Sequence, residues 1–575
     1  MAIAGLGPKG LFALERLLDH TCGLDAAMRM EIDLYEPHPV PGAGPNYDPS
    51  QPAYLRMNFA ADQLDLWWPS SEAVPASERQ PFIAWSAHSG VRHQVFVPDP
   101  DVCTPTDEYP ARAEVGRYLA DGFETLLRHV PPNADVRVRP AAVDAIEADG
   151  PRWAVRAGDA SSSYDEVLIA VGHQDAPDAG PSAGWAHAAP LVAAVFPVGR
   201  RLSRAAVPPG ATVAIRGFAL TFIDAALALT EGRGGSFEPL DHPFRLRYVP
   251  GDDDAGAIVP FTRSGRAMLA KPGPQVAARV PALGRIAAEG RARIADLGGT
   301  VDLHGELMPI LTATACANLV AANGDTGEWS IRVAVGRRLA EAVGGVTAAD
   351  EPDPADAIER SLAVGAGLAP PGVPWALGHT WRSLYPALVA RLGGDGLAAH
   401  DWPAFLRLSA EMERIAFGPP PMNAAKLLAL VEAGRVDLSH VRGGTLGTRE
   451  GRTAVRSERG ERALDVVIDA VLSPPGALGR CGLLADLVAA GSARIAPCRR
   501  GLEVTADASC RAGDGKIATG LAALGRPTED SVIGNDTLSR LVHPQADRWA
   551  RRVAQRCRED YLATRRRGLR GGGRT

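Results

Sequence analysis

The start of the chain alternates between short apolar runs and a glycine-rich turn. Met1–Ala4 is mostly apolar and is followed at once by that turn, and Leu11–Leu18 then repeats leucine at helical spacing. Met30–Glu36 alternates apolar and polar positions, as a half-buried strand does, and it ends in an acid. The pattern therefore predicts a strand, a turn, a helix and a second strand, in that order.

The turn after the first strand has the glycine spacing of a dinucleotide-binding loop. Gly5 would permit a tight turn, Gly7 would let the backbone approach a pyrophosphate, and Gly10 would let the helix pack closely on the strand. An anion placed there would meet the unpaired N–H groups and the positive dipole end of the helix. Glu36 would accept hydrogen bonds from ribose hydroxyls. It lies farther from the glycines than the usual spacing of about 20 residues, so we expect an extended loop before it.

A later pair of apolar runs repeats this arrangement in weaker form. Tyr164–His173 predicts a buried strand that ends at Gly172 and would return beneath the first nucleotide. Thr212–Phe222 again predicts a strand, a turn and a helix. Its glycine pattern is reduced to G-x-A-x-x-F, because Ala219 and Phe222 stand where glycines are expected.

Two interpretations of this second unit stay open. It is either an NAD(P) site or a Rossmann unit that has lost its ligand. In the first case Gly217 and Thr221 belong to the nucleotide loop, and Arg216 and Arg233 pair with a 2′-phosphate or a pyrophosphate. These arginines favour NADPH over NADH.

The remaining pattern divides the chain into further segments. A long Ala/Leu-rich stretch predicts helices, and a β-rich stretch follows it. The fold class we expect is α/β, with two Rossmann-like dinucleotide-binding domains and an inserted mainly helical domain. The predicted ranges are a first Rossmann domain over 1–205, an NAD(P)-binding-like segment over 206–274, a helical insertion over 275–440, a return to the first domain over 441–564, and a basic disordered tail over 565–575.

Composition and charge exclude several classes of protein. The chain has 575 residues, with 67 acidic and 61 basic side chains, and this balance argues against nucleic acid as a partner. We see no apolar run near the roughly 18–20 residues that cross a bilayer. The seven cysteines form no C-x-x-C pair, which argues against a disulfide scaffold, a zinc ribbon and a redox-disulfide flavoenzyme. We expect a cytoplasmic protein with no metal site and no membrane partner.

Several blocks together resemble an FAD/NAD(P)-binding family whose members begin with G-x-G-P-x-G and continue with LERL. The opening of this chain reads Gly5-Leu6-Gly7-Pro8-Lys9-Gly10 and continues with Leu14-Glu15-Arg16-Leu17. Further matching blocks are Gln51–Asn58, Tyr109–Leu119, Leu229–Gly235, Thr262–Lys271, Phe417–Asn423 with Leu427–Gly434, and Gly520–Arg540. The best-defined chemistry in this family belongs to flavin-dependent N-monooxygenases that convert aspartate to nitrosuccinate. The resemblance implies FAD and NADPH as cofactors.

The resemblance also implies roles for individual residues. The FAD diphosphate and adenosine ribose would be held by Gly5, Gly7, Pro8, Lys9, Gly10 and Glu36. Asn58 and Gln51 would approach the isoalloxazine ring as catalytic residues. The pyrimidine end of the flavin would be faced by Gly525 and by the residues Asn535, Asp536 and Thr537. Arg526 would place a cation there and stabilise an anionic reduced flavin.

The implied activity is N-hydroxylation of an amino acid, with L-aspartate as a candidate substrate. NADPH would reduce FAD, O₂ would add to the flavin as a C4a-hydroperoxide, and its distal oxygen would pass to a substrate amine. Only an unprotonated amine has a lone pair, so the site must lower the pKa of the amine by desolvation or nearby cations. A dicarboxylate would need paired arginines, for which the candidates are Arg56, Arg263, Arg266 and Arg382.

Two other classes stay open at this point. One is a different flavoenzyme, such as a C- or S-oxygenase, an oxidase or a dehydrogenase. The other is a catalytically silent flavin-binding accessory protein. The number of oxidation steps and the assembly, for which a homodimer is one option, also stay open.

Overall fold

The first sheet contains the predicted strand, helix and strand at the start of the chain. The computed structural model describes residues 1–571 except 26, 89–108, 175–183, 274, 325–326, 348–349, 395, 474 and 541. The six strands of this sheet lie in the order β17 (Ser509–Arg511), β18 (Ile517–Ala523), β7 (Val167–Ile169), β1 (Ala2–Ala4), β2 (Met30–Tyr35) and β3 (Ala134–Arg139). The strands from β18 to β3 are parallel, and β17 is antiparallel to β18.

The two faces of this sheet bury different elements. One face packs against α1 (Pro8–Cys22), α3 (Arg112–Arg128) and α15 (Gln545–Gly571) through a shared apolar core. The other face packs against a small antiparallel sheet of β4 (Ala145–Asp149), β5 (Arg152–Ala157) and β6 (Ala160–Tyr164), and against α14 (Leu483–Ala489). The short helix α2 (Phe82–His88) lies beside α3. This is the layered arrangement of a Rossmann domain.

The second sheet is smaller and also parallel. Its four strands lie in the order β12 (Ala257–Phe261), β9 (Thr212–Arg216), β16 (Val466–Asp469) and β8 (Leu191–Val192). The helices near this sheet are α4 (Val198–Arg201), α5 (Leu220–Ala228), α10 (Pro354–Gly365) and α13 (Pro421–Glu432). Two antiparallel units complete the domain, β10 (Ser236–Pro239) with β11 (Leu246–Val249), and β13 (Thr445–Arg449) with β14 (Arg452–Ser457) and β15 (Gly460–Ala463).

The strand pairing corrects the predicted domain ranges. The sequence assigned β8 to the first domain and β16 to the return to that domain, but both strands pair in the second sheet. The helices α10 and α13, which fell inside the predicted helical insertion, belong to the core of the second domain. An apolar run in the sequence predicts a buried strand, but it does not show which other strand it pairs with, because that depends on contacts between residues far apart in the chain.

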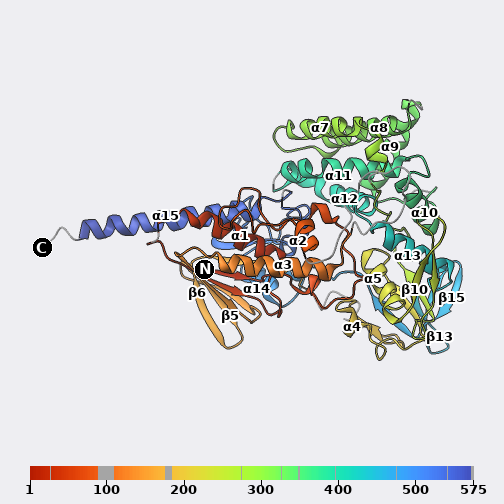
Figure 1. Ribbon diagram of the computed structural model, residues 1–575, viewed down its shortest axis with the longest axis horizontal. Helices are drawn as coiled ribbons and strands as arrows, with labels where there is room; N and C mark the ends of the chain where they lie inside the picture. The colour runs from red at the N-terminus through yellow and green to blue at the C-terminus, as the bar shows by residue number, and fades with distance from the viewer. Residues whose placement is uncertain are drawn as a thin grey trace.

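The helical domain is built from α7 (Ala282–Ala295), α8 (Met308–Asn323), α9 (Glu328–Gly344), α11 (Val373–Leu392) and α12 (Trp402–Ala416), with the short α6 (Gln275–Arg279) before it. Figure 1 shows these helices gathered above the second domain. The α/β fold class with two Rossmann-like sheets and a helical domain is therefore confirmed.

One helical segment differs from the expectation about apolar runs. Residues Leu303–Asn323 are long and apolar enough to cross a membrane by length and composition, with a mean hydropathy of 1.3. In the structure this segment packs against α7, α9 and α11, and Leu311, Ala315 and Leu319 are buried in the shared core. Contacts between helices therefore account for its apolar character.

The predicted disordered tail is wrong for residues 565–571. Helix α15 continues to Gly571 and extends away from the first domain, as Figure 1 shows. The part of α15 that packs against the first domain has already nucleated the helix, so each further residue of the tail extends it at low cost. Arginine, which is abundant in the tail, is a good helix former. Residues 572–575 lie outside the described residues.

A buried ion cluster joins α1 to α15. The Nε of Arg16 donates to Oδ1 of Asp547 at 2.8 Å, and His20 lies 2.9 Å from the same oxygen. Burial opposes the ionisation of Asp547, but hydrogen bonds from His20 and Arg16 outweigh it and lower its pKa to about 2. The carboxylate therefore stabilises the docked helix above pH 4 and loses that effect as the pH falls toward 2.

Asp547→Asn tests this cluster, because it removes the charge and keeps the shape. We expect the free energy of unfolding to fall by roughly 3 kcal/mol, since the buried Arg16, which also pairs with Asp19 and Glu15, loses the carboxylate that joins it to α15. Arg551→Ala is the matched control, because the exposed Arg551 pairs with the other oxygen of Asp547, and it should cost about 0.5 kcal/mol. Denaturant unfolding at pH 7 measures both, and equal losses in the two variants would contradict the assignment.

Candidate functional site

Four parallel strands of the first sheet end at the same edge. Ala4 of β1 lies beside Tyr35 of β2 and beside Ile169 of β7, and Ile169 lies beside Ala523 of β18. The residues that follow these strands therefore meet there, and β1 and β7 flank the point where the strand order reverses. Ligands of open α/β sheets bind at such a point.

The structure gives two of the three glycines the roles that the sequence predicted. Gly5 has a φ of +93°, and a Cβ there would lie 2.5 Å from the carbonyl oxygen of Ala170. A Cβ on Gly10 would lie 2.1 Å from the carbonyl oxygen of Gly5. A side chain at either position would force the turn apart, so both are needed for the close approach of strand and helix.

Gly7 differs, because it faces open space. A Cβ there would meet only the Cα of Gly44, at 4.0 Å. Gly7 precedes α1, whose first turn has no side-chain cap, and Pro8 takes the first helical position without an N–H to satisfy. The free N–H groups and the space beside Gly7 fit a diphosphate.

Glu36 is buried at the end of β2. Its carboxylate accepts hydrogen bonds from the backbone N–H of Leu6 at 2.7 Å and of His38 at 2.8 Å. Each oxygen keeps a second lone pair that can accept a hydrogen bond from a ribose hydroxyl, the role that the sequence predicts for Glu36. Helix α1 ends at Cys22 and β2 begins at Met30, and this separation accounts for the extra spacing before Glu36.

Lys9 connects the glycine loop to the end of the chain. Its Nζ donates to the carbonyl oxygen of Thr537 at 2.6 Å, and its stem lies where a Cβ on Gly525 would point. Burial lowers the pKa of the Lys9 ammonium to about 8. The ammonium of Lys9 is therefore already hydrogen-bonded to a backbone carbonyl.

Gly172, which the sequence also assigns to this edge, is exposed and has a φ of +71°.

A cavity of about 990 Å³ adjoins this edge. Its wall comes from the segments after β2, from α11 and α12 of the helical domain, and from the segment after β18. Six of the predicted site residues line it, namely Asn58, Arg382, Arg526, Asn535, Asp536 and Thr537. A cavity of this size accommodates a ring system together with a small ligand.

The other predicted catalytic residue, Gln51, does not line this cavity. Its Nε2 donates to the carbonyl oxygen of Pro45 at 2.8 Å, so it holds the loop that carries the cavity residue Tyr47. Asn58 does line the cavity. Its Nδ2 donates to the carbonyl oxygen of Phe417 at 3.4 Å, which joins the first domain to the end of α12.

Arg526, the cation that the resemblance implies near the flavin, lies beside two carboxylates of the chain. Its guanidinium lies 3.1 Å from Asp536 and 3.5 Å from Glu529. Two carboxylates therefore balance its charge, and its stabilisation of an anionic flavin stays a prediction.

Arg382 is the predicted substrate arginine that reaches the cavity. Its Nη1 donates to the carbonyl oxygen of Ala416 at 2.9 Å, and burial lowers the pKa of its guanidinium to about 10. Among the described residues no carboxylate lies within ion-pair distance of Arg382. A desolvated cation without such a partner favours an anionic ligand.

The other three candidate arginines lie elsewhere. Arg56 donates to the carbonyl oxygen of Tyr109 at 3.1 Å, and Arg263 is exposed. Arg266 pairs with Glu411 and lies 3.7 Å from Glu351. None of the three lines the large cavity.

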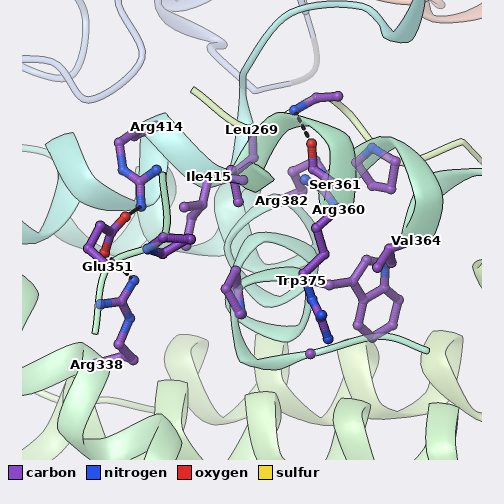
Figure 2. A pocket seen from close by; sticks show the side chains of 16 residues that line it. Leu269, Arg338, Glu351, Arg360, Ser361, Val364, Trp375, Arg382, Arg414 and Ile415 are labelled. Carbon is purple, nitrogen blue, oxygen red and sulfur yellow. Dashed lines mark hydrogen bonds and ion pairs between the residues drawn. The ribbon is translucent and has the colours of Figure 1, made fainter. Parts of the chain in front are cut away.

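Arg266 adjoins a second, smaller cavity of about 100 Å³, between the second domain and the helical domain. Figure 2 shows Glu351 between Arg338 and Arg414 on one side of it, with Trp375 and Arg382 on the other. Arg382 therefore lies in the wall between the two cavities. The arginines around Glu351 bind carboxylates of the chain itself and hold the domains together.

Sequence reasoning missed one charged group of the large cavity. Phe405, Ser409, Glu413 and Phe417 follow one another at four-residue spacing along α12 and its end, and all four line the cavity. Ser409 donates to Oε1 of Glu413 at 3.1 Å. Burial, and after it the nearby Asp536, raises the pKa of Glu413 to about 7. The sequence did contain a signal for this group, namely a glutamate at helical spacing between two phenylalanines on one face of a predicted helix.

The second sheet presents a related but altered edge. Gly217 has a φ of +109° and makes the turn from β9 into α5, where Thr221 lies in the first helical turn. Phe222 is buried against Phe218 at a ring distance of 5.0 Å, so it fills the place of the third glycine by packing into the core. The predicted strand, turn and helix are thus present.

The two arginines of this domain have different surroundings. Arg216 binds Asp469 through two hydrogen bonds of 2.9 and 2.8 Å, at the ends of β9 and β16. Arg233 is buried and donates to the carbonyl oxygens of Asp253, Leu202 and Val207. Its environment favours a structural role, in place of the phosphate contact that the sequence predicted.

The comparisons with known proteins agree with the sequence-based resemblance. Residues 2–174 match the family model described as FAD-NAD(P)-binding. Nitrosuccinic acid synthase of Aspergillus oryzae is 31% identical over 265 residues, which are 44% of this chain and 38% of that protein. An L-aspartate N-monooxygenase (nitrosuccinate-forming) of Streptomyces cremeus is 30% identical over 269 residues, 44% of this chain and 40% of that protein. The matches thus span about two fifths of the length of these relatives.

Two solved structures are similar along the chain. Lysine monooxygenase NbtG from Nocardia farcinica has a TM-score of 0.44 at 13% identity, covering 95% of this chain and 98% of that one. L-lysine 6-monooxygenase from Pseudomonas syringae has a TM-score of 0.45 at 12% identity, covering 97% of this chain and 99% of that one.

The glycine loop yields a paired prediction. Gly10→Ala should lower the thermal stability of the first domain, because its methyl would meet a backbone oxygen. Gly7→Ala should fold normally and weaken flavin binding at least tenfold, or about 1.4 kcal/mol, because its methyl enters the space for the phosphates. Thermal melting and flavin content after purification measure both effects.

Gly23→Ala is the control for this pair, because nothing lies within 4 Å of a Cβ there and its φ is −87°. It should change neither quantity. Full flavin binding in a folded Gly7→Ala protein would contradict the assigned position of the diphosphate.

Proposed function

We propose that this chain is an FAD- and NADPH-dependent monooxygenase that hydroxylates the amine of an amino acid. One observation carries the proposal, namely that the large cavity begins where the glycine loop meets the end of the chain. Lys9 of the loop binds the carbonyl oxygen of Thr537, and Asn535 and Thr537 line the cavity. A flavin held by its diphosphate at the loop would extend its ring into that cavity.

The residues on the first sheet fit FAD. The loop from Gly5 to Gly10 would hold the diphosphate by backbone N–H groups, and Glu36 would hold the adenosine ribose. When bound, the flavin supplies the chemistry that activates O₂. The chain supplies a wall that excludes water, to which Met57, Trp402 and Phe417 contribute apolar surface.

The second sheet is the proposed site of NADPH. The turn at Gly217 and the uncapped start of α5 present backbone N–H groups to a phosphate, as the loop of the first sheet does. The Arg216 side chain is 39% exposed at this edge, so it can meet a 2′-phosphate while it stays paired with Asp469. Under this proposal the second glycine motif still binds NADPH although Ala219 and Phe222 replace two of its glycines.

An amino acid is the proposed substrate because Arg382 offers a cation to its carboxylate. The relatives that are named L-aspartate N-monooxygenases support L-aspartate as the first compound to examine. The desolvated wall around Arg382 would also favour the neutral form of a bound amine. The six cysteines that the structure describes are free thiols, which supports the cytoplasmic location that we propose.

The experiment is a screen of NADPH oxidation by the purified yellow protein across the standard amino acids. Oxidation stimulated by one amino acid, with a hydroxylamine, nitroso compound or nitrite as product, supports the proposal. Bleaching of the flavin by a substrate without NADPH would indicate an oxidase or a dehydrogenase. A folded protein without flavin would indicate an accessory protein.

Arg382→Ala gives a sharper test of the substrate site. Loss of a charged hydrogen bond of about 2–3 kcal/mol should raise KM for the amino acid roughly 30- to 150-fold, with flavin content unchanged. Arg263→Ala is the matched control, because Arg263 is exposed and outside the cavity. An unchanged KM in Arg382→Ala, measured by NADPH consumption, would remove Arg382 from the site.

A further inference from the structure

A single carboxylate stands on the stripe of α12 that faces the large cavity. It belongs to Glu413, one helical turn from the serine that donates to it at 3.1 Å. The side chain opens into the cavity, and the protein walls around that space desolvate its carboxylate. Helix α12 therefore presents an acid to whatever occupies that space.

The four acids on this side of the cavity differ in their partners. Asp536 lies 3.1 Å from Arg526, and Asp530 and Glu529 both pair with Arg500. Glu413 has the hydroxyl of Ser409, and within the described residues no cation lies at ion-pair distance from it. Of these acids, Glu413 is the one available to a cationic ligand.

A cation lies at the same end of α12. Arg382 donates to the carbonyl oxygen of Ala416, three residues after Glu413 on the helix. The two side chains come from neighbouring helices, α11 and α12, and both line the cavity. An amino acid carries a carboxylate and an ammonium group a few ångströms apart, so this cation and this anion match its two charges.

We propose that Glu413 binds the ammonium group of the substrate and takes a proton from it, so that it is the base that makes the amine nucleophilic. This inference rests on the proposed function. In the step, one N–H bond breaks and one O–H bond forms at the carboxylate. The electron pair of the broken bond stays on nitrogen, and no oxidant or reductant takes part.

The surroundings of Glu413 suit this task. Burial raises its pKa to about 7, Asp536 and Asp530 act in the same direction, and Ser409 and Arg526 oppose them. Arg500 and the Tyr385 hydroxyl are the other titratable groups that sense its charge, and burial raises the pKa of Tyr385 as well. A carboxyl with a pKa near 7 is ionised above that pH, yet it holds a proton far better than an ordinary glutamate.

The decisive variant is Glu413→Gln, compared on two substrates at saturating NADPH. L-Aspartate is the probe that needs deprotonation. N-hydroxy-L-aspartate is the probe that does not, because a hydroxylamine is a much weaker base than an amine and is neutral at pH 7. We expect kcat/KM for L-aspartate to fall about 10²- to 10³-fold, and that for the hydroxylamine to fall less than about 5-fold.

The pH profile gives a second measurement. In the natural protein kcat/KM for L-aspartate should fall as the pH drops through about 7, because Glu413 becomes protonated. Glu413→Gln should lose this acid limb, and Glu413→Asp should restore part of the activity. Glu289→Gln, an exposed acid of α7 that pairs with Arg285, is the control and should keep the natural profile.

Equal losses on the two substrates would show a structural role and overturn the inference, as would an unchanged acid limb in Glu413→Gln. A readout without turnover is infrared difference spectroscopy of the carboxyl groups, comparing the natural protein with Glu413→Gln. A band that titrates near pH 7 supports the inference, and one that titrates in the ordinary range of glutamate overturns it. Failure of the proposed function shows differently, as a flavin-bound natural protein that no amine stimulates.

Discussion

The pairing of β18 with β7 is the constraint on which the site depends. It brings the end of the chain back to the sheet that the first residues began, so that Gly525 follows its strand onto the edge where the glycine loop lies. The hydrogen bond from Lys9 to Thr537 then fastens the two segments at that edge. Without this return the large cavity would lack the wall formed by residues after β18, and the loop would face solvent.

Charge is arranged in two different ways around the helical domain. Near the small cavity, arginines and glutamates neutralise one another, as with Glu351 between Arg338 and Arg414. Such ion pairs fix the arrangement of the segments that they join, and they are not available to a ligand because each charge already has a partner. In the large cavity Arg382 and Glu413 each have a neutral partner from the chain, a carbonyl and a hydroxyl. A cavity in which this cation and this anion each have only a neutral partner in the chain is suited to a zwitterion.

The local parts of this architecture could be predicted from the sequence, and the non-local parts could not. The glycine loop and Glu36 were predictable because turn geometry and helix packing restrict which residues fit at short range. The surroundings of Arg233 and Arg266 could not be predicted, since the backbone carbonyls and distant glutamates that pair with a guanidinium leave no mark beside it in the sequence. The role of Glu413 could not be predicted for the same reason, because the cavity that it faces is enclosed by segments that are far apart in the sequence.

The split construction of the first domain has a consequence for its synthesis. On the ribosome, β1, β2 and β7 emerge early, yet the neighbouring strand β18 and the covering helix α15 are among the last elements to be made. The second sheet is complete once β16 has been translated. Nascent chains therefore carry an open sheet edge and an uncovered apolar face of α1 through most of translation, a state prone to aggregation that chaperones recognise.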